Sequence, residues 1–189
     1  MSRSTRLSTV SLFLVLLMTE AGSVAAADTD PPDLPPAVAA QLPEVRIRGG
    51  GELTFLGLSI YDARLYRDAG ARGDCAPDEP FALQLVYKRR LYGERIAARS
   101  VEEMSKLGYG TVEQRARWGE LLKKILPDVE AGDFLTGVNV PKRGVRFYQN
   151  GTSIGAIDDR EFAQAFFGIW LDPRTSEPVL RKQLLGEIP

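Results

Sequence analysis

Residues 158–186, DDREFAQAFFGIWLDPRTSEPVLRKQLLG, have the pattern of two short helices joined by a tight link that contains proline. Asp158 and Glu161 have the spacing of a capping box, which predicts that a helix begins at this point. Large apolar side chains then recur at helical spacing and define one face that we expect to pack against a core. The members of this face are Phe162, Phe166, Ile169 and Trp170.

The second half of this stretch predicts how the two helices are separated. Asp172 precedes Pro173, and a residue before proline is disfavoured in the α conformation, so the first helix should stop there. Ser176 is a suitable N-cap for the second helix, with Pro178 in its first turn. Gly186 is a suitable terminator. By itself the stretch therefore predicts a helical hairpin that closes a core.

The sequence before this hairpin predicts strands, then two helices, then strands. Alternation and aromatic or β-branched residues favour strands, whereas stripes of apolar residues favour helices. The expected strands are residues 44–48, 52–67 (one strand, or two broken near residue 57), 81–88, 133–140, 145–149 and 152–157, and the expected helices are residues 93–107 and 111–126. Strands and helices grouped in this way are typical of an α+β fold, in which an antiparallel β-sheet has helices packed on one face.

Three local patterns refine this prediction. We expect Gly49-Gly50-Gly51 to form a turn between strands, and Asn150-Gly151 to form a type I′ hairpin turn. Thr111 and Gln114 make a second capping box. In the helix that follows, we expect Trp118 near the edge and five residues on the inward face. These five are Val112, Ala116, Leu122, Ile125 and Leu126.

The N-terminal residues have the pattern of a secretory signal peptide. Arg3 and Arg6 precede an uncharged apolar run at residues 10–18, and small residues at 25–27 suit cleavage before Asp28. The apolar run is shorter than the roughly 20 residues that a membrane-spanning helix needs. We expect a signal peptide at residues 1–27, an extended and poorly packed Pro-rich tether at 28–43, and a domain at 44–189. The chain should have no stable membrane span and a periplasmic or secreted location.

The composition excludes several kinds of chemistry. The chain has no histidine and one cysteine, which rules out an intrachain disulfide, histidine-based triads and the usual zinc ligand sets. Removing residues 1–27 leaves 22 of the 24 basic and 24 of the 25 acidic residues, a net charge of −2. Nucleic-acid binding normally needs a basic surface, so this balance does not favour it. We expect no metal, no cofactor and no nucleic-acid partner.

Three separated segments resemble, in the right order, motifs of the chalcone isomerase-like family, which includes bacterial secreted members. The segments are IYDARLY at residues 60–66, FALQLVYKRRLYGERIAARSVEEM at residues 81–104, and the C-terminal stretch with FGIWL at residues 167–171 and LLG at residues 184–186. The resemblance covers residues 44–186. It implies an antiparallel sheet covered on one face by helices.

The resemblance implies two kinds of site. Plant chalcone isomerases close a chalcone to a flavanone with an Arg, a Thr and a Tyr, whereas non-catalytic relatives hold a fatty acid with an Arg and a Tyr. In this chain Tyr61 takes the Thr position and Ile96 the position of the catalytic Tyr. The family Arg is expected in residues 51–54, which contain none. The candidates to replace it are Arg46, Arg48 and Arg64.

A buried acidic ligand restricts which residues can hold it. A carboxylate or enolate needs a cation or several hydrogen-bond donors, because an unpaired charge is costly in a low dielectric. The ordinary alternative is that a strand tyrosine packs its ring and a strand-edge arginine is solvated. No residue is assigned a catalytic role. The expected ligand-binding residues are Tyr61, Arg64, Tyr66 and Tyr87, with Arg89 and Arg90 at a strand end as further donors.

We therefore expect a non-catalytic domain that binds a small amphipathic ligand, such as a fatty acid, between sheet and helices. One alternative is an isomerase or intramolecular lyase that acts on a flavonoid-like or enone substrate. Another is an interaction protein of the cell envelope. An open cavity lined by Tyr61 and an Arg favours binding, whereas a cavity filled by Phe and Trp favours the interaction protein. A desolvated Tyr, Lys or Glu beside an Arg favours catalysis. The sequence identifies neither the ligand nor the oligomeric state.

Overall fold

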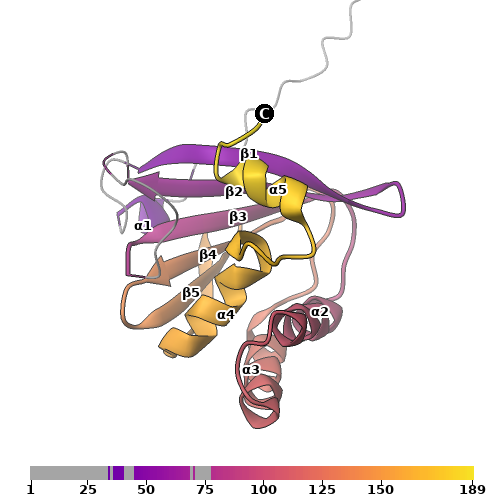
Figure 1. Cartoon of the computed structure of the whole chain (residues 1–189), viewed down its shortest axis with the longest axis vertical. Helices are drawn as coiled ribbons and strands as arrows, with labels where there is room; N and C mark the ends of the chain where they lie inside the picture. Colours follow the sequence, from indigo (N-terminus) through magenta and orange to yellow (C-terminus); the bar gives the residue numbers. More distant parts are fainter. Residues whose placement is uncertain (1–33, 35, 41–44, 69, 71–77) are drawn as a thin grey trace, which may run out of the picture. The chain divides into compact units, whose positions relative to one another are not determined.

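A computed structural model describes residues 34, 36–40, 45–68, 70 and 78–189. The predicted signal peptide and most of the predicted tether lie outside these residues. The described chain forms a six-stranded antiparallel sheet in which neighbours along the sequence are also neighbours in the sheet (Figure 1). Its strands are β1 (Val45–Phe55), β2 (Leu58–Asp68), β3 (Phe81–Tyr87), β4 (Phe134–Val140), β5 (Gly144–Gln149) and β6 (Thr152–Ile157).

The larger helices lie on one face of this sheet. They are α2 (Gly93–Lys106), α3 (Val112–Ile125), α4 (Arg160–Leu171) and α5 (Pro178–Leu184). Helices α4 and α5 lie against the strands, and α2 and α3 pack on each other beside them (Figure 1). The predicted α+β fold is confirmed. No helix in the described part of the chain is both long enough and apolar enough to cross a membrane.

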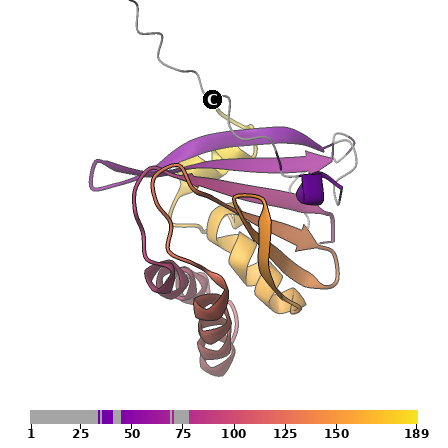
Figure 2. The ribbon, with the colours of Figure 1, turned by 180° about the vertical axis from the view of Figure 1, so that it is seen from behind.

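The opposite face of the sheet is covered in part, at one end, by the short helix α1 (Pro36–Ala39), as Figure 2 shows. Val38 of this helix is completely buried. It belongs to a small apolar cluster with Leu34 and with residues of the outer face such as Tyr66 and Val138. At residues 36–39 the structure differs from the extended, poorly packed tether predicted from the prolines, because the apolar residues of the outer sheet face give this helix a surface to bury against.

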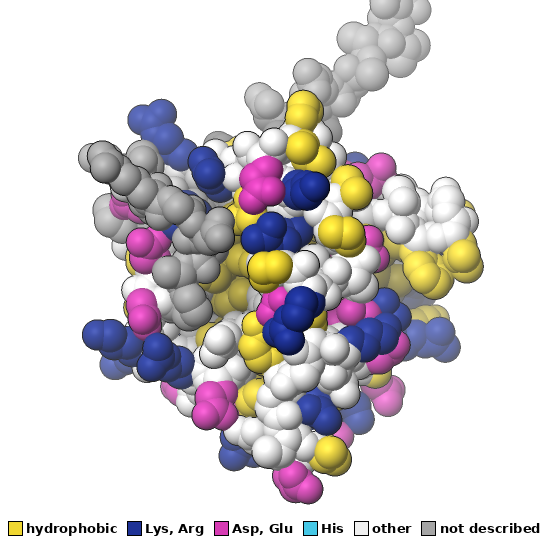
Figure 3. All heavy atoms as spheres, viewed as in Figure 1, with side chains coloured by type: hydrophobic (Ala, Val, Ile, Leu, Met, Phe, Trp, Pro, Cys, Tyr) yellow, Lys and Arg dark blue, Asp and Glu magenta, His cyan; other side chains and the backbone are white. Residues whose placement is uncertain are grey.

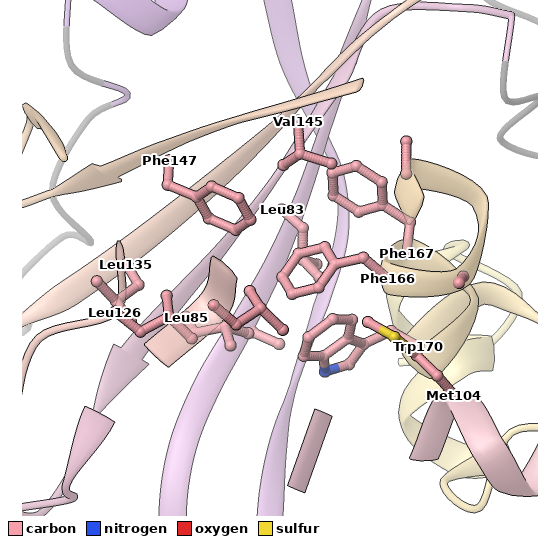
Figure 4. Packing of buried hydrophobic residues seen from close by; sticks show 14 of the residues in the cluster. Leu83, Leu85, Met104, Leu126, Leu135, Val145, Phe147, Phe166, Phe167 and Trp170 are labelled. Atoms are coloured by element: carbon pink, nitrogen blue, oxygen red, sulfur yellow. The ribbon is translucent and has the colours of Figure 1, made fainter. Parts of the chain in front are cut away.

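The main core is aromatic, and α4 supplies much of it (Figure 4). Phe162, Phe166 and Trp170 are all buried. The ring of Phe166 meets the ring of Phe147 on β5 edge-on, with centroids 5.3 Å apart. Ile169 is partly buried against the same cluster. The predicted apolar face of this helix is therefore confirmed.

The glycine run is part of a strand, so the prediction of a turn there was wrong. Gly49 to Gly51 lie inside β1, against which α5 packs. A Cβ atom on Gly49 would lie 2.1 Å from the backbone oxygen of Gln183, and one on Gly51 would lie 2.2 Å from the side-chain oxygen of the same residue. The glycines thus permit a close approach of α5, which is a non-local contact that a turn pattern does not reveal.

The actual hairpin turns lie at two other positions. Asn150 and Gly151 have φ angles of 48° and 84° between β5 and β6. Positive φ at both central residues is the mark of a type I′ turn, so this prediction is confirmed. Leu56 and Gly57 have φ angles of 51° and 74° between β1 and β2. This second turn confirms the alternative that residues 52–67 divide near residue 57.

The cap of α4 lies one residue later than predicted. Asp159 is the N-cap, and its carboxylate accepts a hydrogen bond from the backbone N–H of Phe162 at 3.0 Å. Asp158 instead forms an ion pair with Arg146 of β5 at 2.6 Å. The spacing favoured Asp158 because Glu161 completes a capping box. Arg146 becomes a partner for Asp158 only in the folded sheet, which the spacing does not reveal.

Ser176 does not cap α5, contrary to the prediction. The N-cap of α5 is Glu177, and Pro178 is the first helical residue. The Ser176 hydroxyl donates to the Glu103 carboxylate of α2 at 2.7 Å. This hydrogen bond joins α2 to the link between α4 and α5, so a tertiary partner has replaced the expected local one.

Helix α3 begins with the predicted capping box of Thr111 and Gln114. Its buried face differs from the prediction, because Trp118 is completely buried while Val112 is 69% exposed. Ala116 is also exposed. The helix packs chiefly on α2 rather than flat on the sheet, so its inward face is rotated. The Trp118 indole donates to Asp159 at 2.9 Å, which ties α3 to the start of α4.

Candidate ligand-binding cavity

An apolar cavity of about 310 Å³ lies between the helix-bearing face of the sheet and helices α2 and α4. Its walls include Leu85 and Leu135 from the sheet and the rings of Phe166 and Trp170 from α4, which face the strands in Figure 4. This volume is within the range of small-molecule pockets. The described core therefore leaves room for a small apolar molecule.

Tyr61 provides a hydrogen-bond donor inside this cavity. Its hydroxyl oxygen accepts a hydrogen bond from the Trp170 indole N–H at 2.9 Å, which fixes the position of the hydroxyl. Because that bond uses the oxygen as acceptor, the phenolic proton remains available to a ligand oxygen. Burial raises the pKa of the Tyr61 phenol well above its ordinary value, so the group stays neutral and donates.

Tyr87 is the second phenol in the cavity wall. Its ring lies edge-on to the ring of Tyr61, with centroids 5.9 Å apart. The pairing of Tyr61 with Tyr87 across β2 and β3 places both side chains on the same face of the sheet. Burial raises the pKa of Tyr87 as well. The two strands thus present a pair of neutral phenols to the same space.

Charged side chains from α2 line part of the cavity. Arg99 is exposed and lies 2.5 Å from the carboxylate of Glu103, which is itself 4% exposed. Glu103 also contacts Lys106 at 3.1 Å and accepts the Ser176 hydrogen bond. Three partners therefore compensate its buried charge, as a buried carboxylate requires.

Two further charged residues, Arg95 and Glu177, lie in the cavity wall. Arg95 forms no ion pair with any residue in the described ranges, and its guanidinium lies 5.9 Å from the ring centre of Tyr92. Burial, followed by the neighbouring Glu103, raises the pKa of Glu177. A ligand at this end of the cavity would meet Arg95, which has no ion-pair partner among the described residues, and a glutamate whose pKa is raised.

The structure separates the four residues that the sequence suggested for ligand binding. Tyr61 and Tyr87 line the cavity, whereas Arg64 and Tyr66 lie on the opposite face of the sheet. The Tyr66 hydroxyl donates to Gln84 on that face at 3.3 Å. Successive residues of a strand point to opposite faces, so positions 64 and 66 of β2 cannot share a site with position 61.

The charged residues of α2 and of the link that precedes α5 were not expected from the sequence. Arg95, Arg99, Glu103 and Glu177 all line the cavity. The spacing of Arg99 and Glu103, four residues apart on a helix, indicates an ion pair on one helical face but not what that face covers. The neighbouring Ile96 also lines the cavity, so the position that resembles the family's catalytic tyrosine presents a side chain with no hydrogen-bond donor.

A comparison with known families covers almost all of this domain. The family model described as chalcone isomerase-like matches residues 31–186. The chain belongs to the chalcone isomerase-like family. The expectation drawn from the three motifs is therefore confirmed, and the match extends N-terminally to include α1.

One sequence relative and one solved structure show how far this chalcone isomerase-like chain resembles other proteins. An uncharacterized protein of Haemophilus influenzae is 28% identical over 139 residues, which are 74% of this chain and 67% of the relative. The crystal structure of a fatty-acid binding protein of Arabidopsis thaliana aligns with a TM-score of 0.59 at 12% identity. The alignment covers 77% of this chain and 88% of that protein. At this identity the likeness shows the fold alone.

The chalcone isomerase-like cavity has the chemistry of a binding site for a molecule with an apolar body and a polar end. Leucine and aromatic side chains form most of the wall, while two phenols and the α2 arginines supply donors. Neutral phenols can hydrogen-bond a carbonyl, hydroxyl or carboxylate oxygen. The arrangement is therefore suited to holding such a ligand in one orientation.

Proposed function

We propose that this protein binds a small amphipathic molecule, of which a fatty acid is the leading example, in the cavity between the sheet and the helices. The observation that carries the proposal is an open apolar cavity whose wall holds Tyr61 with its phenolic proton free to donate. A cavity filled by its own Phe and Trp side chains would instead favour a structural role. The fatty-acid binding protein of the same fold supports the choice of ligand class.

The polar end of the ligand is placed at Tyr61, and the apolar body lies along Leu85, Leu135 and Phe147. A carboxylate at this point accepts the Tyr61 hydrogen bond and is attracted by the α2 arginines. These groups provide the cation and donors that a desolvated carboxylate needs.

The test compares two single-atom changes in β2. Fatty acids of increasing chain length are titrated against wild type, Tyr61→Phe and Tyr66→Phe by calorimetry. Removing a hydrogen bond to a charged ligand should weaken binding about tenfold or more in Tyr61→Phe. Tyr66→Phe is the matched control, because it also removes a buried phenolic oxygen but on the other face of the sheet.

A cavity-filling variant addresses the case in which Tyr61→Phe is too unstable to assay. Ile96→Trp adds bulk at the cavity wall without removing a hydrogen bond, and it should also abolish binding. Saturable fatty-acid binding that neither Tyr61→Phe nor Ile96→Trp changes would contradict the proposal. Mass spectrometry of molecules extracted from natively purified protein would identify the ligand itself.

A second candidate function is an isomerase or intramolecular lyase of the chalcone isomerase type. The observation that favours it is the desolvated Tyr61 phenol, which interacts electrostatically with Glu177, Arg99 and Glu103. Against it stands Ile96 at the position resembling the catalytic tyrosine. Chalcone cyclisation well above the spontaneous rate, and lost in Tyr61→Phe, would favour this candidate over simple binding.

A further inference from the structure

The end of the β1–β2 hairpin exposes a group of large apolar side chains. Phe55 is 58% exposed, Leu56 is 86% exposed and Leu58 is 49% exposed. Figure 1 shows this hairpin projecting beyond the rest of the sheet, and Figure 3 shows hydrophobic side chains gathered at its end. We call Phe55, Leu56 and Leu58 the hairpin tip.

Leu56 occupies a backbone position that does not suit leucine. It has φ = 51° in the same type of turn in which the second hairpin of this chain uses Asn150, with φ = 48°. Asparagine tolerates the left-handed region, whereas a side chain like that of leucine is strained there. Leu56 is also the most exposed of the three tip residues. Neither turn geometry nor core packing therefore explains why this position is a leucine.

Basic and aromatic side chains follow β3 in a segment that contacts β2 beside the hairpin tip. The Arg89 Nε donates to the backbone oxygen of Ser59 at 2.9 Å, beside Leu58. Arg90 and Arg95 lie 5.2 and 5.9 Å from the ring centre of Tyr92, which is 49% exposed. Among the described residues Arg89 and Arg95 form no ion pair, while Arg90 contacts Glu130 at 3.3 Å. Arginine and tyrosine next to exposed apolar residues are typical of membrane–water interfaces.

The hairpin tip is continuous with the candidate cavity. Phe55 of the tip and Arg95 of α2 both line the cavity as well as being exposed. A molecule that leaves the cavity past these residues therefore emerges beside Leu56 and the unpaired arginines. This places the entrance where an apolar surface would shield an amphipathic ligand from water.

We propose that the hairpin tip docks on an anionic lipid bilayer, so that the cavity exchanges its ligand with that membrane; this rests on the proposed function. The apolar side chains enter the boundary between headgroups and acyl chains, while Arg89 and Arg95 pair with anionic headgroups. A stable protein interface buries about 1,200 Å² or more. Three side chains at a projecting turn suit shallow insertion better than such an interface.

The test is a flotation assay with lipid vesicles. It uses protein purified with its naturally processed N-terminus. Vesicles of phosphatidylcholine are compared with vesicles that also contain phosphatidylglycerol. Leu56→Asn should reduce binding about tenfold, because burial of one leucine contributes at least that factor. Binding should require phosphatidylglycerol and decline with added salt. Leu56→Asn introduces the residue type that the other type I′ turn has at this position, so loss of binding cannot reflect a damaged turn.

Two controls make the result specific. Val112→Gln removes another exposed apolar side chain, on α3, and should leave vesicle binding unchanged. In solution without vesicles, Leu56→Asn should bind fatty acid as wild type does, whereas Tyr61→Phe should lose fatty acid yet still float with vesicles. The docking proposal and the ligand proposal can therefore fail separately.

Several results would overturn the docking proposal. Equal vesicle binding by wild type and Leu56→Asn would do so, as would absence of binding by wild type. A concentration-dependent dimer in size-exclusion chromatography that Leu56→Asn abolishes would also overturn it, because the hairpin tip would then be the contact with a second copy of the chain.

Discussion

Tyr61 lies in the cavity because alternate residues of β2 face the helices and position 61 is one of them. Tyr61 pairs with Tyr87 and faces the helices, while Arg64 pairs with Gln84 and faces the other layer. Residues at odd and even positions of one strand point to opposite faces, so a single residue of displacement exchanges the two sets. The chemical suitability of Arg64 for a carboxylate is therefore irrelevant to this cavity, and the cations come from α2 instead.

Gly49 provides a test of close packing at the scale of a single residue. Gly49→Ala should destabilise the protein by roughly 1–3 kcal/mol, because its Cβ would lie 2.1 Å from the Gln183 oxygen and 2.7 Å from the Leu184 oxygen. Both obstacles are backbone atoms, so α5 must shift as a unit. The measurement is the free energy of unfolding from urea denaturation.

The matched control for this prediction is Gly119→Ala in α3. There the nearest atom to the new Cβ is the Val101 Cγ2, 3.2 Å away at the end of a side chain. Alanine is favoured over glycine within a helix, so this change should be near neutral or stabilise by up to about 1 kcal/mol. Equal effects of the two substitutions would show that α5 does not rest tightly on β1.

At the scale of the element, the link between α4 and α5 is held by one carboxylate. Asp172 ends α4 and accepts hydrogen bonds from the Tyr109 hydroxyl at 2.7 Å and from Arg174 through its backbone and guanidinium groups. The same link contributes Ser176 to Glu103 of α2. This short segment thus joins α2, α4 and α5 around the polar end of the cavity.

This network predicts a loss of stability in acid. The Arg174 guanidinium, together with the backbone N–H of Arg174 and the Tyr109 hydroxyl, holds the pKa of Asp172 well below its usual range despite burial. Below about pH 4, the ordinary aspartate value, the unfolded chain takes up a proton that the folded chain resists. The stabilisation should therefore be complete at neutral pH and decline as the pH falls below about 4.

The measurement is the free energy of unfolding of wild type and Asp172→Asn at pH 6 and pH 3. Asp172→Asn should be less stable at pH 6 and should lose less stability on acidification. Asp158→Asn is the control, because that carboxylate is 68% exposed in its ion pair with Arg146. An unchanged acid dependence in Asp172→Asn would refute the assignment.

At the scale of the whole molecule, the sheet is packed on both faces, and the two faces have different roles. The helix-bearing face holds the cavity, and the outer face is covered in part by α1. The family match from residue 31 includes this segment, so part of the predicted tether belongs with the folded domain. Removing the residues before Glu44, which include α1, would expose Tyr66, Val138 and Tyr148.

We also propose that the protein is exported and that residues 1–27 are removed. The basic start, the apolar run and Ala25 to Ala27 motivate this proposal. Intact-mass measurement of the exported protein should give an N-terminus at Asp28. Replacing Ala25 and Ala27 by bulky residues should block cleavage and retain the precursor. An exported pool that begins at Met1 would contradict the proposal.

The sequence by itself determined the order and nature of most elements, because the signals are local. The capping box of Thr111 and Gln114, the Asn150-Gly151 turn and the apolar periodicity of α4 depend on residues within a few positions of one another. The motifs at residues 60–66, 81–104 and 158–186 then led to the family and so to the sheet with its helices. The alternation of side chains along a strand also predicts that Tyr61 lies on the opposite face from Arg64 and Tyr66.

Tertiary structure alone decided which groups meet. The glycines of β1 serve the approach of α5, and Ser176 bonds to Glu103 from 73 residues away. Arg95 and Arg99 reach the cavity because α2 packs against α4, whose side chains form another part of the same wall. Such contacts join segments that are remote in sequence, and their partners are fixed by the packing of whole layers rather than by local backbone preference. Of the phenols expected from the sequence, Tyr61 and Tyr87 line the cavity and Tyr66 does not, and the charged residues that line it were not expected.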